Sequence, residues 1–210
     1  MRFANRQDAG RRLAKALEIY KGRDLVIYAL PRGGVILGFE IAKELGAPLD
    51  IVFSKKIGHP LNPEYAVCAI TEEGDMFCNE SEKSLLDPEW LKKEAEKQRR
   101  EIIRRRTVYL GSRKRIKATG KIAIIVDDGI ATGLTIKAAI KFLSKENPKK
   151  IIVASPVAPH DIVEELKKEA NGIVVLEDAK NYLGAVGAYY DDFPQVTDKE
   201  IIELLLCDSY

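Results

Sequence analysis

The most constraining feature of this sequence is an apolar run that ends at a pair of glycines. Residues 24–30 (DLVIYAL) have the length and composition of a buried strand, and a Pro-Arg-Gly-Gly turn follows at residues 31–34. An apolar helical pattern then covers residues 35–45 and ends at Gly46, and residues 49–54 form a second apolar run. A strand, a helix and a second strand in this order predict a parallel βαβ unit with a right-handed crossover.

The same alternation of strands and helices resumes in the second half of the chain. A length of 210 residues, with 46% hydrophobic and 31% charged residues, suits one domain with a solvated surface. The other expected elements are helices at 6–20, 88–109, 136–143, 160–170 and 201–206, strands at 121–126, 150–155 and 173–176, and a hairpin of 66–71 with 76–78.

We therefore expect one α/β domain over residues 1–210, with a mostly parallel twisted sheet and helices on both faces. Residues 57–117 interrupt it as an insertion that holds a mobile loop, a hairpin and a basic helix. The turn formers within residues 57–81 are the reason to expect mobility there. Residues 177–210 form a C-terminal tail.

Histidine and cysteine are too scarce for most metal centres. The two histidines, His59 and His160, exclude a multi-histidine site, and three cysteines without a CxxC spacing argue against structural zinc. The same cysteine usage favours a reducing cytoplasm, so we expect Cys68 and Cys78 to face each other across the hairpin as free thiols. No apolar run approaches the ~18–20 residues that span a bilayer, and no secretory signal is visible, so a cytoplasmic location without membrane contact is expected.

Candidate site residues follow two strand ends, where ligands bind in parallel α/β sheets. Arg32 and the glycines after it can offer a guanidinium and free backbone N–H groups to an anion, although a plain turn is the alternative. Asp127 and Asp128 are adjacent carboxylates, which are costly to place together unless they meet hydroxyls or a cation. Residues 129–135 (GIATGLT) then bring hydroxyls and glycines to a helix start that can wrap a phosphate.

Carboxylates next to a phosphate cradle predict a sugar-phosphate site. The spacing of residues 127–135 matches neither the P-loop pattern GxxxxGK[ST] nor the dinucleotide pattern GxGxxG. Both of those nucleotide-binding classes therefore lose support.

Three segments resemble motifs of one family, the type I phosphoribosyltransferases. VDDGIATGLT at residues 126–135 closely resembles the family's phosphoribosyl diphosphate signature, and ALPRGG at residues 29–34 resembles its diphosphate loop. The Ser-Lys-Lys segment at residues 54–56 resembles the basic pair that precedes the family's mobile loop. In this order the motifs cover roughly residues 24–176, and the whole chain is similar to a little-characterised branch of the family.

The resemblance implies transfer of the 5-phosphoribosyl group from 5-phosphoribosyl 1-diphosphate (PRPP) to a nitrogenous base, with release of diphosphate and with Mg²⁺ as cofactor. Asp127 and Asp128 would hold the ribose hydroxyls, and residues 131–135 would cradle the 5-phosphate. Arg32, next to a cis peptide bond from Pro31, would hold diphosphate, and Lys56 would reach it when the loop closes. The donor would hold most of the Mg²⁺ coordination, with one of the two aspartates as a possible ligand. The full donor-binding set implied is Arg32, Gly33, Gly34, Lys55, Lys56, Asp127, Asp128, Gly129, Ile130, Ala131, Thr132, Gly133, Leu134 and Thr135.

The acceptor base stays open. Members that act on oxopurines carry a third aspartate where this chain has Ala131, and a lysine after the next strand, which residues 155–159 lack. Tyr182 in the tail is the candidate for stacking on a base, with core packing as the alternative.

A basic segment supplies a second hypothesis. Residues 92–117 hold twelve basic and three acidic side chains, whereas the rest of the chain has a net negative charge. The alternative is a non-catalytic regulator on the same scaffold that senses PRPP or nucleotides and binds nucleic acid. Glutamates interleave with the arginines and the remainder of the chain repels a polyanion, so nucleic-acid binding is not expected. A solvated helix face or a homodimer contact is the alternative role of this segment.

Overall fold

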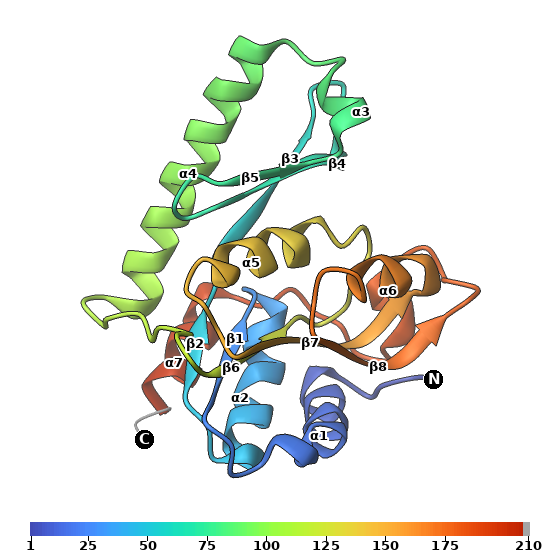
Figure 1. Ribbon diagram of the computed structural model, residues 1–210. Helices are drawn as coiled ribbons and strands as arrows, with labels where there is room; N and C mark the ends of the chain where they lie inside the picture. The colour runs from blue at the N-terminus through green and yellow to red at the C-terminus, as the bar shows by residue number, and fades with distance from the viewer. Residues whose placement is uncertain (208–210) are drawn as a thin grey trace.

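A five-stranded parallel sheet forms the centre of the computed structural model, which describes residues 1–207 (Figure 1). The strand order is β2-β1-β6-β7-β8, and every neighbouring pair is parallel. This confirms the predicted fold class. The strands are β1 (Leu25–Ala29), β2 (Leu49–Ile51), β6 (Ile122–Val126), β7 (Lys150–Pro159) and β8 (Gly172–Ala179).

The chain adds β2 on one side of β1 and then β6, β7 and β8 on the other side, so β1 and β6 are neighbours in the sheet. Loops leaving the carboxyl ends of two such strands diverge to opposite faces and leave a crevice between them, which is where ligands bind in open α/β sheets. The loops that follow β1 and β6 are the two that carry the candidate site residues.

Helices cover both faces of the sheet (Figure 1). Side chains of β1 alternate, so that Ile27 packs into one apolar cluster and Val26 into another. The first cluster includes Leu13, Leu37 and residues of the last helix, and the second includes Phe142. The helices on the first face are α1 (Arg6–Ala16), α2 (Gly33–Leu45) and α7 (Asp198–Cys207), and those on the second are α5 (Leu134–Ser144) and α6 (His160–Leu166). Two short 3-10 helices, η1 (Glu18–Tyr20) and η2 (Val186–Tyr189), lie in connections.

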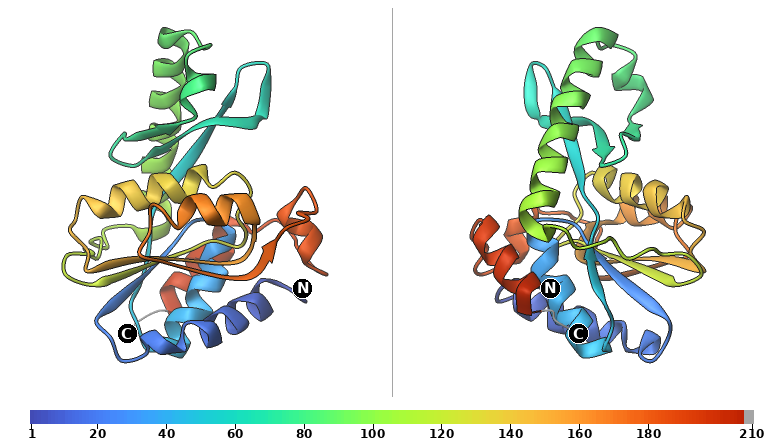
Figure 2. Two further views of the ribbon diagram at one scale, coloured as in Figure 1. Left: turned by 45° about the vertical axis from the view of Figure 1, so that its right-hand side comes forward. Right: turned by 90° about the vertical axis from the view of Figure 1, so that its left-hand side faces the viewer.

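Residues 54–110 form an arm that projects beyond the central sheet (Figure 2). The arm holds an antiparallel sheet in the order β3-β4-β5, followed by two helices. These elements are β3 (Ser54–His59), β4 (Asn62–Thr71), β5 (Met76–Cys78), α3 (Glu80–Lys83) and α4 (Pro88–Leu110). The side chain of Asp87 caps the start of α4, and Pro88 occupies its first turn, as the sequence indicates.

Several boundaries differ from the sequence-based expectation. The second strand ends at Ile51 rather than at residue 54, and β3 was not expected because its sequence, SKKIGH, has no apolar run. β7 continues to Pro159 because β8 pairs with it along this whole stretch. The helix expected over residues 160–170 ends at Leu166.

The expectation of free thiols in the hairpin is wrong. β4 and β5 pair with Cys68 directly opposite Cys78, as the hairpin prediction implied, and the structure joins the two residues by a disulfide. Adjacent cross-strand side chains are close enough to touch, which is the condition that a disulfide needs. The side chain of Cys207 lies outside the described residues.

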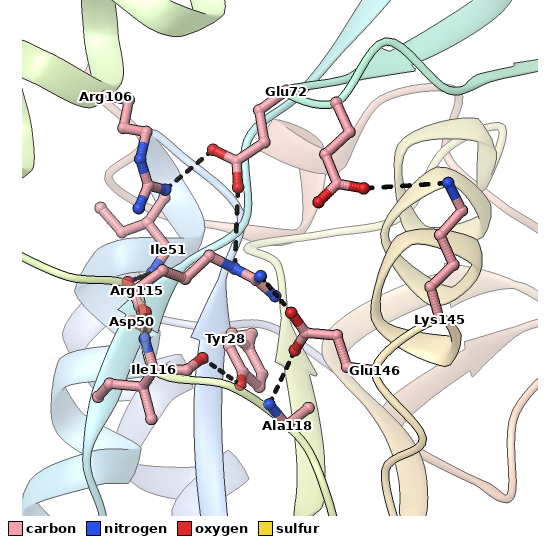
Figure 3. Close-up of polar contacts among 11 residues, drawn as sticks. Tyr28, Asp50, Ile51, Glu72, Arg106, Arg115, Ile116, Ala118, Lys145 and Glu146 are labelled. Carbon is pink, nitrogen blue, oxygen red and sulfur yellow. Dashed lines mark hydrogen bonds and ion pairs between the residues drawn. The ribbon is translucent and has the colours of Figure 1, made fainter.

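A largely buried network of polar side chains ties the arm to the central part of the protein (Figure 3). Glu72, in the turn between β4 and β5, pairs with Arg106 of α4 at 2.9 Å and with Arg115 at 3.7 Å. Arg115 also pairs with Glu146, whose other carboxylate oxygen accepts a hydrogen bond from the backbone N–H of Ala118 at 2.8 Å. The network therefore fixes the turn of the hairpin, the end of α4 and the loop after α5 against one another.

None of the helices in residues 1–207 combines the length and the apolar character needed to cross a membrane.

Candidate functional site

A cavity of about 400 Å³ lies at the carboxyl ends of β1 and β6, where the fold predicts a ligand site. It brings together segments from the core, the arm and the tail. The lining residues are Arg6, Pro31, Ser54, Lys55, Lys56, Arg105, Asp127, Asp128, Gly129, Ile130, Ala131, Thr132, Gly133, Thr135, Val186 and Phe193. A larger cavity of about 520 Å³ lies between α1 and α2, but exposed side chains of both charges line it and no strand end among the described residues reaches it.

The loop after β6 ends at a helix start with free N–H groups. Gly133 has a φ of +72°, a left-handed conformation that glycine adopts without strain, and it directs the chain into α5. No side chain in the described part of the protein caps this helix, so its first backbone N–H groups stay available to an anion, and Thr135 adds a hydroxyl. Leu134, one of the expected donor-binding residues, instead packs against Ala138 in a small apolar cluster.

The two carboxylates of this loop have different partners. The backbone N–H of Asp128 donates to Asp127 Oδ1 at 2.9 Å, and Asp128 Oδ2 pairs with Arg6 Nε at 2.7 Å. Desolvation by burial raises the pKa of Asp127, and the neighbouring charge of Asp128 raises it further. Burial also raises the pKa of Asp128, although Arg6 acts in the opposite direction. Asp127 is thus the member of the pair that keeps its proton more readily.

Arg6 is a site residue that the sequence did not identify. Its side chain is buried, lies 3.6 Å from the ring centroid of Phe193, and donates to the backbone carbonyl of Pro194 at 2.7 Å. Arg6 therefore connects the acidic pair to the C-terminal tail. One signal was available: a cation in the first turn of a helix is unfavourable to the helix dipole unless an anion lies nearby.

The glycine loop packs directly on the acidic loop. A Cβ atom added to Gly33 would lie 1.7 Å from Asp128 Oδ2, and one added to Gly34 would lie 2.6 Å from the carbonyl oxygen of Val126. These glycines permit the close approach of the two loops. The Pro31–Arg32 peptide bond is cis, as expected. The Arg32 side chain is directed to α7, where it lies 3.7 Å from Asp198, and it does not line the cavity.

The arm closes one side of the cavity with basic side chains. Lys55 and Lys56 come from β3, and Ser54 donates from its hydroxyl to the carbonyl of Thr135 at 3.3 Å, which holds the start of β3 beside α5. Arg105 of α4 joins them. The sequence identified the two lysines, but not this arginine.

The tail contributes Phe193 and Val186 rather than Tyr182. The ring of Tyr182 stacks on that of Tyr189 at a centroid distance of 5.6 Å and packs against the core. Tyr182 is absent from the cavity lining. Its role in stacking on a base stays a prediction. Tyr190 does not line the cavity, but its hydroxyl donates to the backbone carbonyl of Asp128 at 2.6 Å and so holds the acidic loop.

Among the side chains that the structure describes, which leave out those of Glu64 and Cys207, no group of three or more from histidine, cysteine, aspartate or glutamate could hold a metal ion. Among these residues, the acidic pair supplies all of the carboxylates in the cavity lining.

Sequence comparison identifies the family. The model of the phosphoribosyl transferase domain matches residues 4–192, which is most of the chain. This protein belongs to the phosphoribosyltransferase family. The motif resemblance is thereby confirmed at the level of the family.

Two curated relatives come from Mycobacterium tuberculosis. They are named "Putative phosphoribosyl transferase" MT0597 (strain CDC 1551 / Oshkosh) and Rv0571c (strain ATCC 25618 / H37Rv). Each is 40% identical over 205 residues, a match that covers 97% of this chain and 46% of the relative. The chain therefore spans about half the length of these relatives.

Solved structures agree with the fold. TT1426 from Thermus thermophilus is similar with a TM-score of 0.79 and 39% identity, and the match covers 98% of each chain. AQ2163 from Aquifex aeolicus has a TM-score of 0.50 and 15% identity over 82% of this chain and 74% of its own. At that identity the second likeness concerns the fold alone.

Proposed function

We propose that this protein transfers the 5-phosphoribosyl group of PRPP to a nitrogenous base and releases diphosphate. The observation that carries the proposal is the meeting, in one cavity, of an acidic pair, an uncapped helix start and three basic side chains of the arm. The acidic pair suits the ribose hydroxyls, the start of α5 suits the 5-phosphate, and the basic side chains suit the diphosphate.

The chemistry needs opposite charges on the two sides of the ribose. The bond between C1 and the diphosphate oxygen breaks and its electron pair leaves with the diphosphate. A bond forms from the base nitrogen to C1, and that nitrogen gives its proton to water or to the departing diphosphate. Positive charge develops on the sugar in between. Asp127 and Asp128 would stabilise that charge, whereas Lys55 and Lys56 would neutralise the departing diphosphate.

The site fits Mg²⁺ that is held mainly by the donor. Magnesium in phosphate-binding sites commonly uses one or two carboxylates together with substrate phosphates. Asp127 or Asp128 would supply the protein ligand, and the described cavity lining offers no further carboxylate. Bound there, the ion would reduce the negative charge of the diphosphate.

In the alternative function, a regulator that binds nucleic acid, the arginines of α4 would contact the phosphates. Arg104 and Arg105 pair with Glu101, and Arg106 pairs with Glu72, so much of the basic charge has partners within the chain. Nucleic acid would have to compete with these carboxylates. This pairing favours the transferase over the regulator.

A cytoplasmic location and a homodimer stay predictions.

Calorimetry with PRPP and Mg²⁺ tests the donor site. Asp127→Asn and Asp128→Asn together should weaken PRPP binding by about tenfold or more, because the ribose hydroxyls lose charged acceptors. Asp191→Asn is the matched control, since Asp191 pairs with Arg2 on the surface and does not line the cavity. Equal affinity of the double variant and the control would contradict the assignment of the ribose site.

A further inference from the structure

Three consecutive arginines on α4 have three different surroundings. Arg104 is exposed and pairs with Glu101 at 2.7 Å. Arg106 points to the polar network and pairs with Glu72 at 2.9 Å. Arg105 lies between them, donates to Glu101 at 2.9 Å, and is the only one of the three that lines the cavity. The basic helix is therefore not only a solvated face.

The polar network, whose residues Figure 3 shows, holds α4 in one orientation about its axis. Arg106 and Arg115 share the carboxylate of Glu72, and Arg115 is anchored on the core side by Glu146. These side chains are largely buried, so rotation of α4 about its axis would separate charged groups inside the protein. Since neighbouring positions on a helix point about 100° apart, fixing Arg106 also fixes the direction of Arg105.

Among its described side chains, the arm contributes three basic ones and no carboxylate to the lining of the cavity. Lys55 is half-buried beside Arg105, and Lys56 follows on the same strand. No ion pair joins either lysine to a carboxylate in the described part of the chain. Burial lowers the pKa of Lys55, and the charge of Arg105 lowers it further, whereas the charge of Glu101 acts in the opposite direction. Like charges held together in this way indicate a site for a polyanion.

We propose that Arg105 binds the diphosphate group of the donor together with Lys55 and Lys56, which makes α4 of the arm a part of the active site. Glu101 acts as a positioning residue that holds the Arg105 guanidinium over the cavity. The start of α5 takes the other phosphate of the donor, so the two anionic ends bind to different parts of the chain. This inference rests on the proposed function and assigns to that site a residue that the family motifs do not include.

The test compares Arg105→Gln with Arg104→Gln. The two positions are adjacent on α4 and share Glu101, but only Arg105 lines the cavity. Binding of PRPP, of inorganic diphosphate and of ribose 5-phosphate is measured by calorimetry in the presence of Mg²⁺, and Tm is measured for every variant. Arg105→Gln should weaken PRPP and diphosphate about tenfold or more and leave ribose 5-phosphate within about twofold, since only the diphosphate meets the guanidinium. Arg105→Lys should restore part of the loss, and Arg104→Gln should bind all three like the unaltered protein.

Each other outcome has a distinct meaning. Unaltered protein that binds neither PRPP nor diphosphate would contradict the proposed function itself. Unaltered protein that binds PRPP, combined with equal affinities for the two glutamine variants, would contradict the role of Arg105 alone. Equal loss of diphosphate and ribose 5-phosphate in Arg105→Gln would show that this arginine only supports the shape of the site, and would also overturn the proposal.

Discussion

Arg6 Nε lies 2.7 Å from Asp128 Oδ2, so the first helix of the chain neutralises a carboxylate that lies 122 positions further along. The same guanidinium covers the ring of Phe193 and binds the carbonyl of Pro194. One side chain thus holds the amino-terminal helix, the acidic loop and the tail in contact. Two consequences follow, one for stability and one for the charge of the acidic pair.

Replacing Arg6 should cost stability and alter the pH dependence of donor binding. Arg6→Gln leaves Asp128 buried without its cation, a change that typically costs about 3–5 kcal/mol in the free energy of unfolding. Arg6 lowers the pKa of Asp128, so its loss should raise that pKa and move the acid limb of PRPP affinity to higher pH. Denaturant unfolding and calorimetry across pH measure both effects.

The surface pair of Arg12 with Asp8 supplies the control for this experiment. Arg12→Gln removes an arginine from the same helix, but the Arg12 side chain is 45% exposed whereas that of Arg6 is 8% exposed, so it should cost less than about 1 kcal/mol. An unmoved pH profile in Arg6→Gln would show that Arg6 does not set the charge of Asp128.

Asp127→Asn should stabilise the empty protein while it weakens donor binding. The pKa of Asp127 is raised in the folded state, so the folded protein holds this proton more tightly than the unfolded chain does. The penalty for burying the charge is absent below the unfolded pKa, grows as pH rises towards the folded pKa, and is complete above it. The gain from asparagine should therefore appear at neutral pH, at roughly 1 kcal/mol or about 2–4 °C in Tm, and vanish in acid. Thermal unfolding at several pH values measures it, and a gain that is equal at every pH would contradict the assigned charge state.

Gly33→Ala should disrupt the acidic loop. The added Cβ would lie 1.7 Å from Asp128 Oδ2 and 2.9 Å from Arg6 Nε, so the carboxylate must move. PRPP affinity should fall about tenfold or more. Gly46→Ala, at the other end of α2, is the control: its φ of +63° also penalises alanine, but no described atom lies near its Cβ. Both variants should lose stability, and retention of donor affinity in Gly33→Ala would contradict the packing of the two loops.

Substitution of two aromatic residues of the tail should have different effects on the KM for the acceptor. Phe193 lines the cavity and Tyr182 does not, so Phe193→Leu should raise the KM for the acceptor roughly two- to tenfold. Tyr182→Leu should lower Tm and leave that KM unchanged, because Tyr182 packs on Tyr189. Steady-state kinetics at saturating PRPP distinguish the two. A raised acceptor KM in Tyr182→Leu alone would instead support the base-stacking role predicted for Tyr182 from the sequence.

Local patterns in the sequence were enough to predict the central sheet and the two loops of the site. The apolar runs of β1 and β6 are nearly continuous because both faces of these strands are buried, and the loops that follow them carry their own chemistry. The alternation of strands and helices then implied parallel pairing. Asp127 and Asp128 therefore lie at the cavity that their position after β6 predicts.

Residues brought to the site by distant segments could not be predicted in this way. Arg6 looks like any basic residue in a surface helix, and Arg105 is one of twelve basic residues in a single segment. Arg105 faces the cavity because the pairing of Glu72 with Arg106 and Arg115 sets the orientation of α4. Arg32 is the opposite case, a residue that a sequence motif predicts as a ligand of diphosphate. In the structure its side chain pairs with Asp198.

Release of diphosphate from PRPP in the presence of candidate bases is the most direct test of the proposed transferase. Purines, pyrimidines and other nitrogen nucleophiles are offered one at a time with Mg²⁺, and diphosphate and the nucleotide product are both quantified. We expect at least one acceptor to give the two products in equal amounts, and the Asp127→Asn/Asp128→Asn variant to abolish their formation. Tight binding of PRPP, with diphosphate release for every acceptor no faster than in that variant, would contradict the transferase and leave a donor-binding protein without turnover.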